Sequence, residues 1–222
     1  MERMIFEPPT VSCLKTILDE VKSGELMVPK FCRKFVWSDG RKLQLLDSIA
    51  SGLPIGSLLV WSTKKMYFDS YGNVGGVQVG RKTNIWGKKC HYLVDGHQRV
   101  ATLLGALYSA ESTMDDNHRP VYSGICAGRS TFRAPAAGEM FPQFWVPLEI
   151  LFDSDKLFEF TLDLRKQRMD YHARDAERLA NVFMDYLIPI VQLVTDNLDV
   201  VKQTLVRING HAKEEKNTTE DA

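Results

Sequence analysis

The stretch HYLVDGHQRVATLLGAL, residues 91–107, decides the fold, because it predicts a buried strand that turns directly into an apolar helix. Tyr92 to Val94 form a short apolar run, and Asp95-Gly96 is a turn signal. The following apolar residues recur at helical spacing, and they are Val100, Leu103, Leu104 and Leu107. We therefore expect a helix that begins near His97.

The start of such a helix is a favourable place for an anion. Its first N–H groups have no partner within the helix, and the helix dipole is positive there. Gly96 would let a ligand approach the backbone, and the N–H groups of His97 and Gln98 would face it. Arg99, expected on the exposed first turn, adds a positive charge. The structural alternative is a capping box, in which Asp95 caps the helix and Gln98 bonds back to it.

The rest of the chain predicts an α+β fold, because strands and helices alternate irregularly. Further helices are expected from Thr10 or Ser12 to Gly24, Ser38 or Asp39 to Gly52, Ser154 to Arg165, Asp170 to Tyr186 and Asn197 to Ile208. Further strands or extended segments are expected over 26–28, 31–37, 58–61, 145–150 and 188–194. A hairpin is expected within 66–89, and a long loop or an insertion over 111–142.

Length and composition predict one compact unit. The chain has 222 residues, of which 44% are hydrophobic, enough for one well-filled core. We expect a single domain over residues 1–210 and a polar, disordered tail over 211–222. The four cysteines lack paired spacing, so neither a disulfide framework nor a zinc knuckle is predicted.

The charge balance and hydropathy limit the function classes. Twenty-eight basic and 28 acidic residues cancel, so no overall positive field attracts nucleic acid, and any DNA contact must be local. No apolar run approaches the roughly 20 residues that span a bilayer, and no leader is recognisable at the N-terminus. We expect a cytoplasmic protein that does not enter the membrane.

Four motifs support a family resemblance. They are VPKFCRKFVW at 28–37, LLDSIASGLPIGSLLVW at 45–61, YLVDGHQRVATLLGAL at 92–107 and RING at 207–210. In this order they resemble the N-terminal domain of the GmrSD-type, modification-dependent restriction enzymes, a family related to the ParB and sulfiredoxin superfamily. Its pattern is VPxFQRxFVW, LLDSIxxGxPIGSLLLW, YLVDGQQRLTTLLGAL and RIN-x-x-G. The resemblance implies a small mixed sheet surrounded by helices, with a C-terminal helical extension.

The resemblance implies nucleotide chemistry at the DGHQR turn, the DGQQR motif of the family. In ParB-type nucleotide hydrolases and sulfiredoxin-type enzymes a Gly-x-x-Arg turn contacts nucleotide phosphates, which points here to Gly96 through Arg99. The expected ligand is a nucleoside triphosphate with Mg²⁺, and Asp95 is the candidate metal ligand. Asp95 and His97 are the candidate catalytic residues. For His97 the alternative is an ordinary hydrogen-bonding residue at a helix start.

Three residues outside the turn are further phosphate-binding candidates. Arg33 would point from a strand into the same pocket, or would lie on a solvated strand edge beside core aromatics, whereas Lys34 alternates to the opposite face. Arg207 and Asn209 would complete the pocket from the far end of the fold. The alternative is that Arg207 to Gly210 form an ordinary helix C-terminus with a glycine cap.

Two residues depart from the family pattern close to this turn. Cys32 stands where the family has Gln, and His97 stands where it has the first Gln of the polar pair. A thiol and a titratable imidazole therefore replace neutral amides. We expect nucleotide preference or hydrolysis rate to differ from those of relatives.

Together these residues predict a nucleotide-binding regulatory domain of a DNA-defence system, with or without hydrolysis of the nucleotide. Full-length relatives carry the nuclease as a C-terminal domain, and this chain is too short to contain one. The expected partner is therefore a separately encoded nuclease subunit. One alternative is a ParB-type DNA-binding module that uses Arg129 and Arg133. Another is a stand-alone nuclease that uses Asp95 and a metal. His118, in a faint His-Asn-His nuclease pattern, is expected to be solvated.

Overall fold

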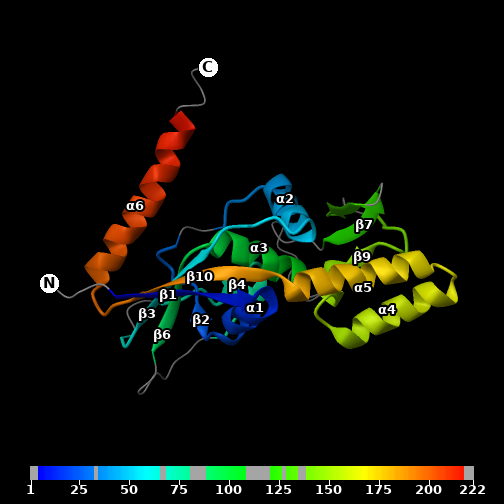
Figure 1. The fold of residues 1–222 in the computed structure, drawn as a ribbon, viewed down its shortest axis with the longest axis horizontal. Helices are drawn as coiled ribbons and strands as arrows, with labels where there is room; N and C mark the ends of the chain where they lie inside the picture. The colour runs from blue at the N-terminus through cyan, green and yellow to red at the C-terminus, as the bar shows by residue number, and fades with distance from the viewer. Residues whose placement is uncertain are drawn as a thin grey trace.

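A computed structural model describes residues 5–32, 35–65, 69–80, 89–108, 121–126, 129–134 and 139–217. The centre of the fold is a mixed five-stranded sheet (Figure 1). In spatial order its strands are β1 (Ile5–Cys13), β10 (Leu187–Val194), β3 (Leu58–Thr63), β6 (Cys90–Asp95) and β2 (Leu26–Met27). β10 is parallel to β3 and β2 is parallel to β6, whereas the other two pairs are antiparallel. The predicted α+β class is confirmed.

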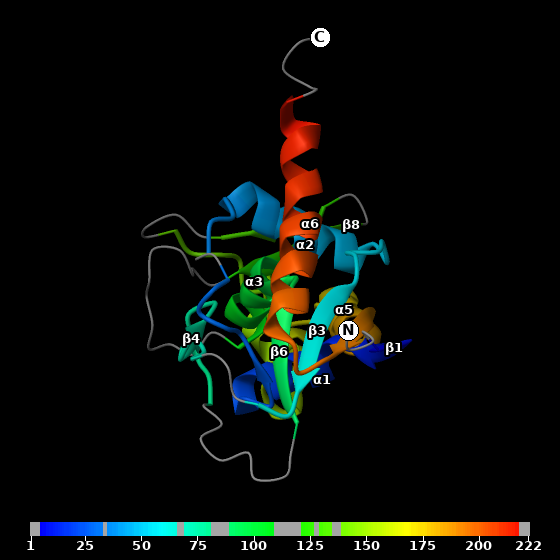
Figure 2. The ribbon, with the colours of Figure 1, turned by 90° about the vertical axis from the view of Figure 1, so that its left-hand side faces the viewer.

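The central strands are buried on both faces, so their side chains alternate between two apolar clusters. Leu58 and Val60 face the main core, to which helices α1 (Leu14–Ser23) and α3 (His97–Leu107) contribute. Leu59 and Trp61 pack on the opposite face, where the Trp61 ring stacks on Tyr92 at 5.2 Å between centroids. The first turns of helix α6 (Leu198–Asn217) cover that second face. Farther along, α6 projects away from the sheet, as Figures 1 and 2 show.

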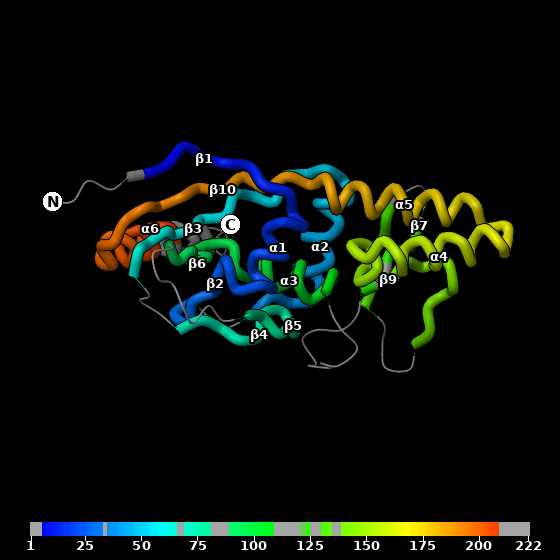
Figure 3. The backbone as a smooth tube through the Cα atoms, turned by 90° about the horizontal axis from the view of Figure 1, so that it is seen from below, coloured from blue at the N-terminus to red at the C-terminus, as the bar shows by residue number. Residues whose placement is uncertain are grey.

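The remaining elements include a helical hairpin that extends the molecule at the end opposite α6 (Figure 3). The helices are α2 (Asp39–Ala50), the 3-10 turn η1 (Leu148–Ile150), α4 (Ser154–Lys166) and α5 (Asp170–Asp185). A small sheet holds β7 (Tyr122–Cys126), β8 (Arg129–Arg133) and β9 (Val146–Pro147), and a separate hairpin holds β4 (Asn73–Val74) and β5 (Val77–Gln78). Helices α4 and α5 lie side by side as a hairpin.

Most of the expected elements are present. In α1 the side chains of Leu14, Ile17, Leu18 and Val21 form a buried apolar face, and Gly24 ends the helix with a left-handed backbone, φ 81°. The strand-turn-helix of β6 and α3 lies where the pattern places it, as do α2, β3, β10 and the α4–α5 hairpin.

Two expectations about secondary structure were wrong. Residues 5–13 form edge strand β1, so the first helix is capped at Cys13 and not at Thr10 or Ser12. β7 and β8 form an antiparallel hairpin inside the segment expected to be a loop. In both cases pairing between distant segments overrides the local pattern.

α6 also differs from its expected length. It continues to Asn217, so helical backbone enters the segment expected to be a disordered tail, and the single domain over residues 1–210 stays a prediction. Within the described ranges, no helix has the length and apolarity needed to cross a bilayer.

Leu103 provides a test of how strongly the core depends on α3. Its side chain is fully buried in the main cluster. We expect Leu103→Ala to lower the free energy of unfolding by about 2 to 5 kcal/mol, because the lost contacts leave a cavity. The measurement is chemical denaturation. Val206→Ala, on the exposed side of α6, is the control and should change stability by less than about 0.5 kcal/mol. Equal stability of the two variants would contradict a central role for α3.

Candidate functional site

The candidate site begins where β6 ends and α3 starts. Asp95 is the last residue of β6, and Gly96 is the N-cap of α3 with a left-handed backbone, φ 95°. Among the described residues, no side chain caps this helix. The capping-box alternative for Asp95 and Gln98 is therefore wrong, because the cap residue lies one position later.

Gly96 is required for packing as well as for its backbone angle. A Cβ atom at this position would lie 2.3 Å from Cδ2 of Leu58 and 3.1 Å from Nη2 of Arg99. Gly96 is also buried. The space that a side chain would need is thus taken by β3, and this glycine allows α3 to start close against the neighbouring strand.

A substitution at Gly96 tests this tight turn. We expect Gly96→Ala to destabilise the protein by about 2 to 4 kcal/mol, since alanine would have a left-handed backbone and its Cβ would overlap Leu58. Gly40→Ala is a matched control, because Gly40 lies in α2, where an added Cβ would meet no described atom within 4 Å. That change should be neutral or stabilise by up to about 1 kcal/mol. Thermal and urea unfolding of both variants provide the comparison, and similar losses would contradict the proposed strain.

Arg99 is a bracing residue, and the expectation that it lies on an exposed turn was wrong. Only 16% of its side chain is exposed. Nη1 donates to the carbonyl oxygen of Ile55 at 2.7 Å, and Nη2 donates to that of Ser57 at 2.8 Å. Nη2 also lies 3.4 Å from Oδ2 of Asp95. Burial lowers the pKa of Arg99, and the Asp95 charge partly offsets that effect.

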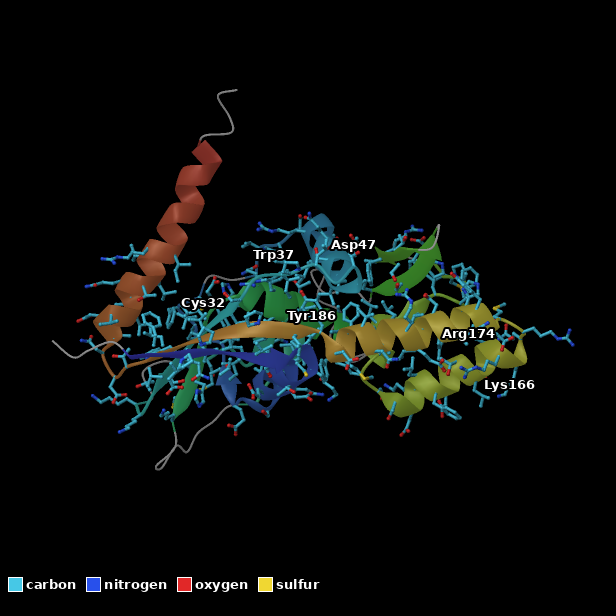
Figure 4. All side chains as sticks on the ribbon, in the orientation of Figure 1. Cys32, Trp37, Asp47, Lys166, Arg174 and Tyr186 are labelled. Atoms are coloured by element: carbon cyan, nitrogen blue, oxygen red, sulfur yellow. The ribbon has the colours of Figure 1, made fainter. Side chains whose placement is uncertain are left out.

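The loop held by Arg99, residues 53–57, is fixed from a second side by Tyr186 (Figure 4). The Tyr186 hydroxyl donates to the carbonyl oxygen of Leu53 at 2.7 Å and accepts from the Ile55 N–H at 3.2 Å. Burial raises the pKa of Tyr186, so the phenol keeps the proton that it donates. Gly56 in this loop has φ 87°, and a Cβ there would lie 2.8 Å from Nη1 of Arg99. The loop and the guanidinium therefore fit each other closely.

Because Arg99 joins three groups, its removal should affect stability. We expect Arg99→Ala to lower the free energy of unfolding by about 1 to 3 kcal/mol, since two carbonyls lose their donor and Asp95 loses its ion pair. Differential scanning calorimetry measures the loss. Lys166→Ala, whose side chain is 65% exposed, is the control and should have almost no effect. A melting temperature equal to that of the parent would rule out the bracing role.

The Gln98 side chain links the first turn of α3 to the backbone of Val36, and it determines the tautomer of His97. Its Oε1 accepts from the backbone N–H of Val36 at 2.9 Å, so its Nε2 is the end that lies 2.9 Å from Nε2 of His97. An amide NH₂ only donates, so His97 accepts through Nε2 and, when neutral, has its proton on Nδ1. The lone pair that a general base would use is therefore engaged by Gln98.

Cys32, which stands in place of the family's Gln, is buried beneath the turn. Its Sγ lies 3.7 Å from the carbonyl oxygen of Leu93, and its own carbonyl accepts from the Tyr71 hydroxyl at 3.0 Å. Burial, with the nearby charge of Asp95, raises the pKa of Cys32 to about 12. The thiol is thus protonated at neutral pH and contributes no charge to the site.

An open groove beside Arg99 contains residues that the sequence analysis missed. It lies between α2 and the 53–57 loop and is lined by Trp37, Arg41, Gln44, Leu45, Ser48, Ile55 and Arg99. The Arg41 guanidinium lies over the Trp37 ring, 4.7 Å from its centroid. The four-residue spacing of Trp37 and Arg41 was visible in the sequence, but nothing there showed that they share a groove with Arg99.

The other predicted site residues are not brought to this turn by the described structure. Arg33, Lys34 and His118 lie outside the described residues. Arg207 is exposed on α6, and Asn209 belongs to the same helix, although its side chain is not described. Since α6 continues past Gly210, the glycine-cap alternative is wrong.

The metal prediction for Asp95 has limited support from its surroundings. Among the described residues, no three His, Cys, Asp or Glu side chains gather in a way that could hold an ion. Asp95 is 44% exposed and is the acidic side chain at the turn. Mg²⁺ is commonly held by one or two carboxylates together with substrate phosphates and water. The residues present therefore fit a magnesium ion that arrives with a nucleotide.

The fold and this turn define an α+β domain with a strand-turn-helix site, carrying the Asp95–Arg99 pair, at the end of β6. The family model described as GmrSD restriction endonuclease, N-terminal domain, matches residues 14–219. The chain therefore belongs to this family, as its motifs indicated. None of the curated proteins compared with it matches.

Proposed function

We propose that this chain is a nucleotide-binding regulatory domain of a DNA-defence system, and that it binds nucleotide phosphates at the turn from Asp95 to Arg99. The observation that carries the proposal is the position of Arg99. Its guanidinium is held at the N-terminal end of α3, next to a carboxylate and at the edge of an open groove. A fixed cation at the positive end of a helix favours an anion without further ordering cost.

The proposed ligand is a nucleoside triphosphate with Mg²⁺. The first N–H groups of α3 and the Arg99 guanidinium would bind phosphate oxygens, and Asp95 would supply one oxygen to the metal ion. The metal ion would neutralise phosphate charge. Arg33 and Arg207, with Asn209, stay candidate phosphate contacts whose test requires the ligand.

Hydrolysis of the nucleotide is a finer proposal that depends on Asp95 and His97. Asp95 is exposed enough to accept a hydrogen bond from an attacking water. His97 would serve as a base only after its Nε2 atom leaves the Gln98 amide, so a ligand-induced rearrangement of this pair is required. With that pair intact, the proposed role of His97 is to hold Gln98 in place.

The defence role follows from family membership, because the family takes its name from a restriction endonuclease. We propose that the domain senses nucleotide, and through it DNA, for a separately encoded nuclease. The DNA-binding alternative would use Arg133, which forms an ion pair with Glu139 at 2.9 Å and lies over the Phe141 ring. A DNA phosphate would compete with Glu139 for Arg133, as a nucleotide phosphate would compete with Asp95 for Arg99.

A thermal-shift panel of the four ribonucleoside triphosphates, with and without Mg²⁺, tests the proposed function. A ligand present at about 100 times its dissociation constant should stabilise the protein by about 2.7 kcal/mol. We expect at least one triphosphate to raise the melting temperature. If none does, with Mg²⁺ or without it, the proposed function is refuted.

Asp95→Asn separates the metal contribution from phosphate binding. We expect the variant to lose most of the Mg²⁺ dependence of nucleotide affinity, because an amide is a poor ligand for this ion. Affinity without Mg²⁺ should be equal or higher, since a negative charge near the phosphates is gone. Isothermal titration calorimetry at both conditions measures the two effects. An unchanged Mg²⁺ dependence would remove Asp95 from the metal site.

A further inference from the structure

The groove next to Arg99 is basic, which distinguishes it from two other hollows in the described part of the chain. Two guanidinium groups line it, from Arg41 and Arg99, and none of the described side chains that line it is acidic. The hollow beside β1 contains Glu20 and Glu25, and the one beside α5 contains Asp185. An anion is therefore favoured in the groove of Arg41 and disfavoured in the other two.

Arg41 is oriented for binding before any ligand arrives. Its guanidinium lies over the Trp37 ring, which restricts its rotamers and leaves N–H donors at the edge of the guanidinium plane. An arginine ordered in this way loses little side-chain entropy when it binds a phosphate. Its neighbour Lys42 differs, because it forms an ion pair with Asp39 at 2.9 Å.

Two polar side chains of α2 also line the groove. Gln44 and Ser48 lie one helical turn apart on the face that lines it. The Ser48 hydroxyl donates to the carbonyl oxygen of Gln44 at 2.8 Å, so its remaining polar capacity is that of an acceptor. The groove thus combines two cations with a carboxamide and a hydroxyl, a combination suited to a phosphate chain and its attached sugar.

We propose that this groove binds the distal phosphates of the nucleotide and that Arg41 is their ligand. Arg99 belongs both to the groove and to the turn. When one phosphate is held at the start of α3, the phosphates that follow it would therefore enter the groove. The inference rests on the proposed function and adds to it the residue that binds the distal phosphates. Arg41 makes the site selective for nucleoside triphosphates over monophosphates.

The test compares the affinities of mono-, di- and triphosphates of adenosine, guanosine, cytidine and uridine for three proteins. The parent is compared with Arg41→Gln and with Lys166→Gln, which removes the same charge at the outer end of the α4–α5 hairpin, far from Trp37 (Figure 4). We expect Arg41→Gln to weaken triphosphate binding about tenfold or more and to change monophosphate binding less than about twofold. Lys166→Gln should leave both nearly unchanged. Melting temperatures of the unliganded variants show whether each is folded.

The outcomes separate this inference from the proposed function. If the parent binds none of the nucleotides, both proposals fail together. If the parent binds triphosphates and Arg41→Gln preserves its ratio of triphosphate to monophosphate affinity, only the assignment of Arg41 fails. An equal loss of affinity for mono-, di- and triphosphates would also overturn the assignment of Arg41. Such a loss would place Arg41 at the base, the sugar or the first phosphate.

Discussion

The guanidinium of Arg99 makes the contacts on which the candidate site depends. It joins the end of β6, the start of α3 and the loop that leads into β3, through contacts with Asp95, Ile55 and Ser57. β3 and β6 are already paired as antiparallel neighbours in the sheet. Arg99 adds hydrogen bonds and an ion pair at the place where β6 ends and β3 begins. The position of the groove relative to the turn is consequently set by the same residue that is expected to bind phosphate.

The local part of this arrangement was predictable, and the long-range part was not. A short apolar run, a turn signal and helical spacing sufficed to locate β6 and α3. The pattern also placed Arg99 on the first helical turn, but it could not show that the carbonyl groups of a distant loop would bury it. The groove was missed for the same reason, because Arg41 and Arg99 come from segments that only the folded sheet brings together.

Edge strand β1 shows how tertiary pairing overrides local signals. Its sequence contains Pro8 and Pro9, which disfavour regular strand pairing. The register with β10 shifts between Glu7 and Thr10, so the prolines fall at an irregularity, and pairing continues on either side. β10 was predicted because its apolar run is long, whereas its partner has no comparable run. A strand of this kind is recognisable only after the strand that it pairs with is placed.

The two departures from the family pattern alter the charge of the site less than their residue types suggest. Cys32 is protonated at neutral pH because burial and the charge of Asp95 oppose the thiolate. His97 accepts a hydrogen bond from Gln98, an arrangement that the neutral imidazole satisfies. Among the described residues, the remaining charged side chains of the turn and groove are Asp95, Arg99 and Arg41, which together carry one net positive charge. A triphosphate carries several negative charges, so these residues cannot neutralise it alone. The dependence on a divalent cation proposed for this site therefore follows from its charge balance as well as from the carboxylate of Asp95.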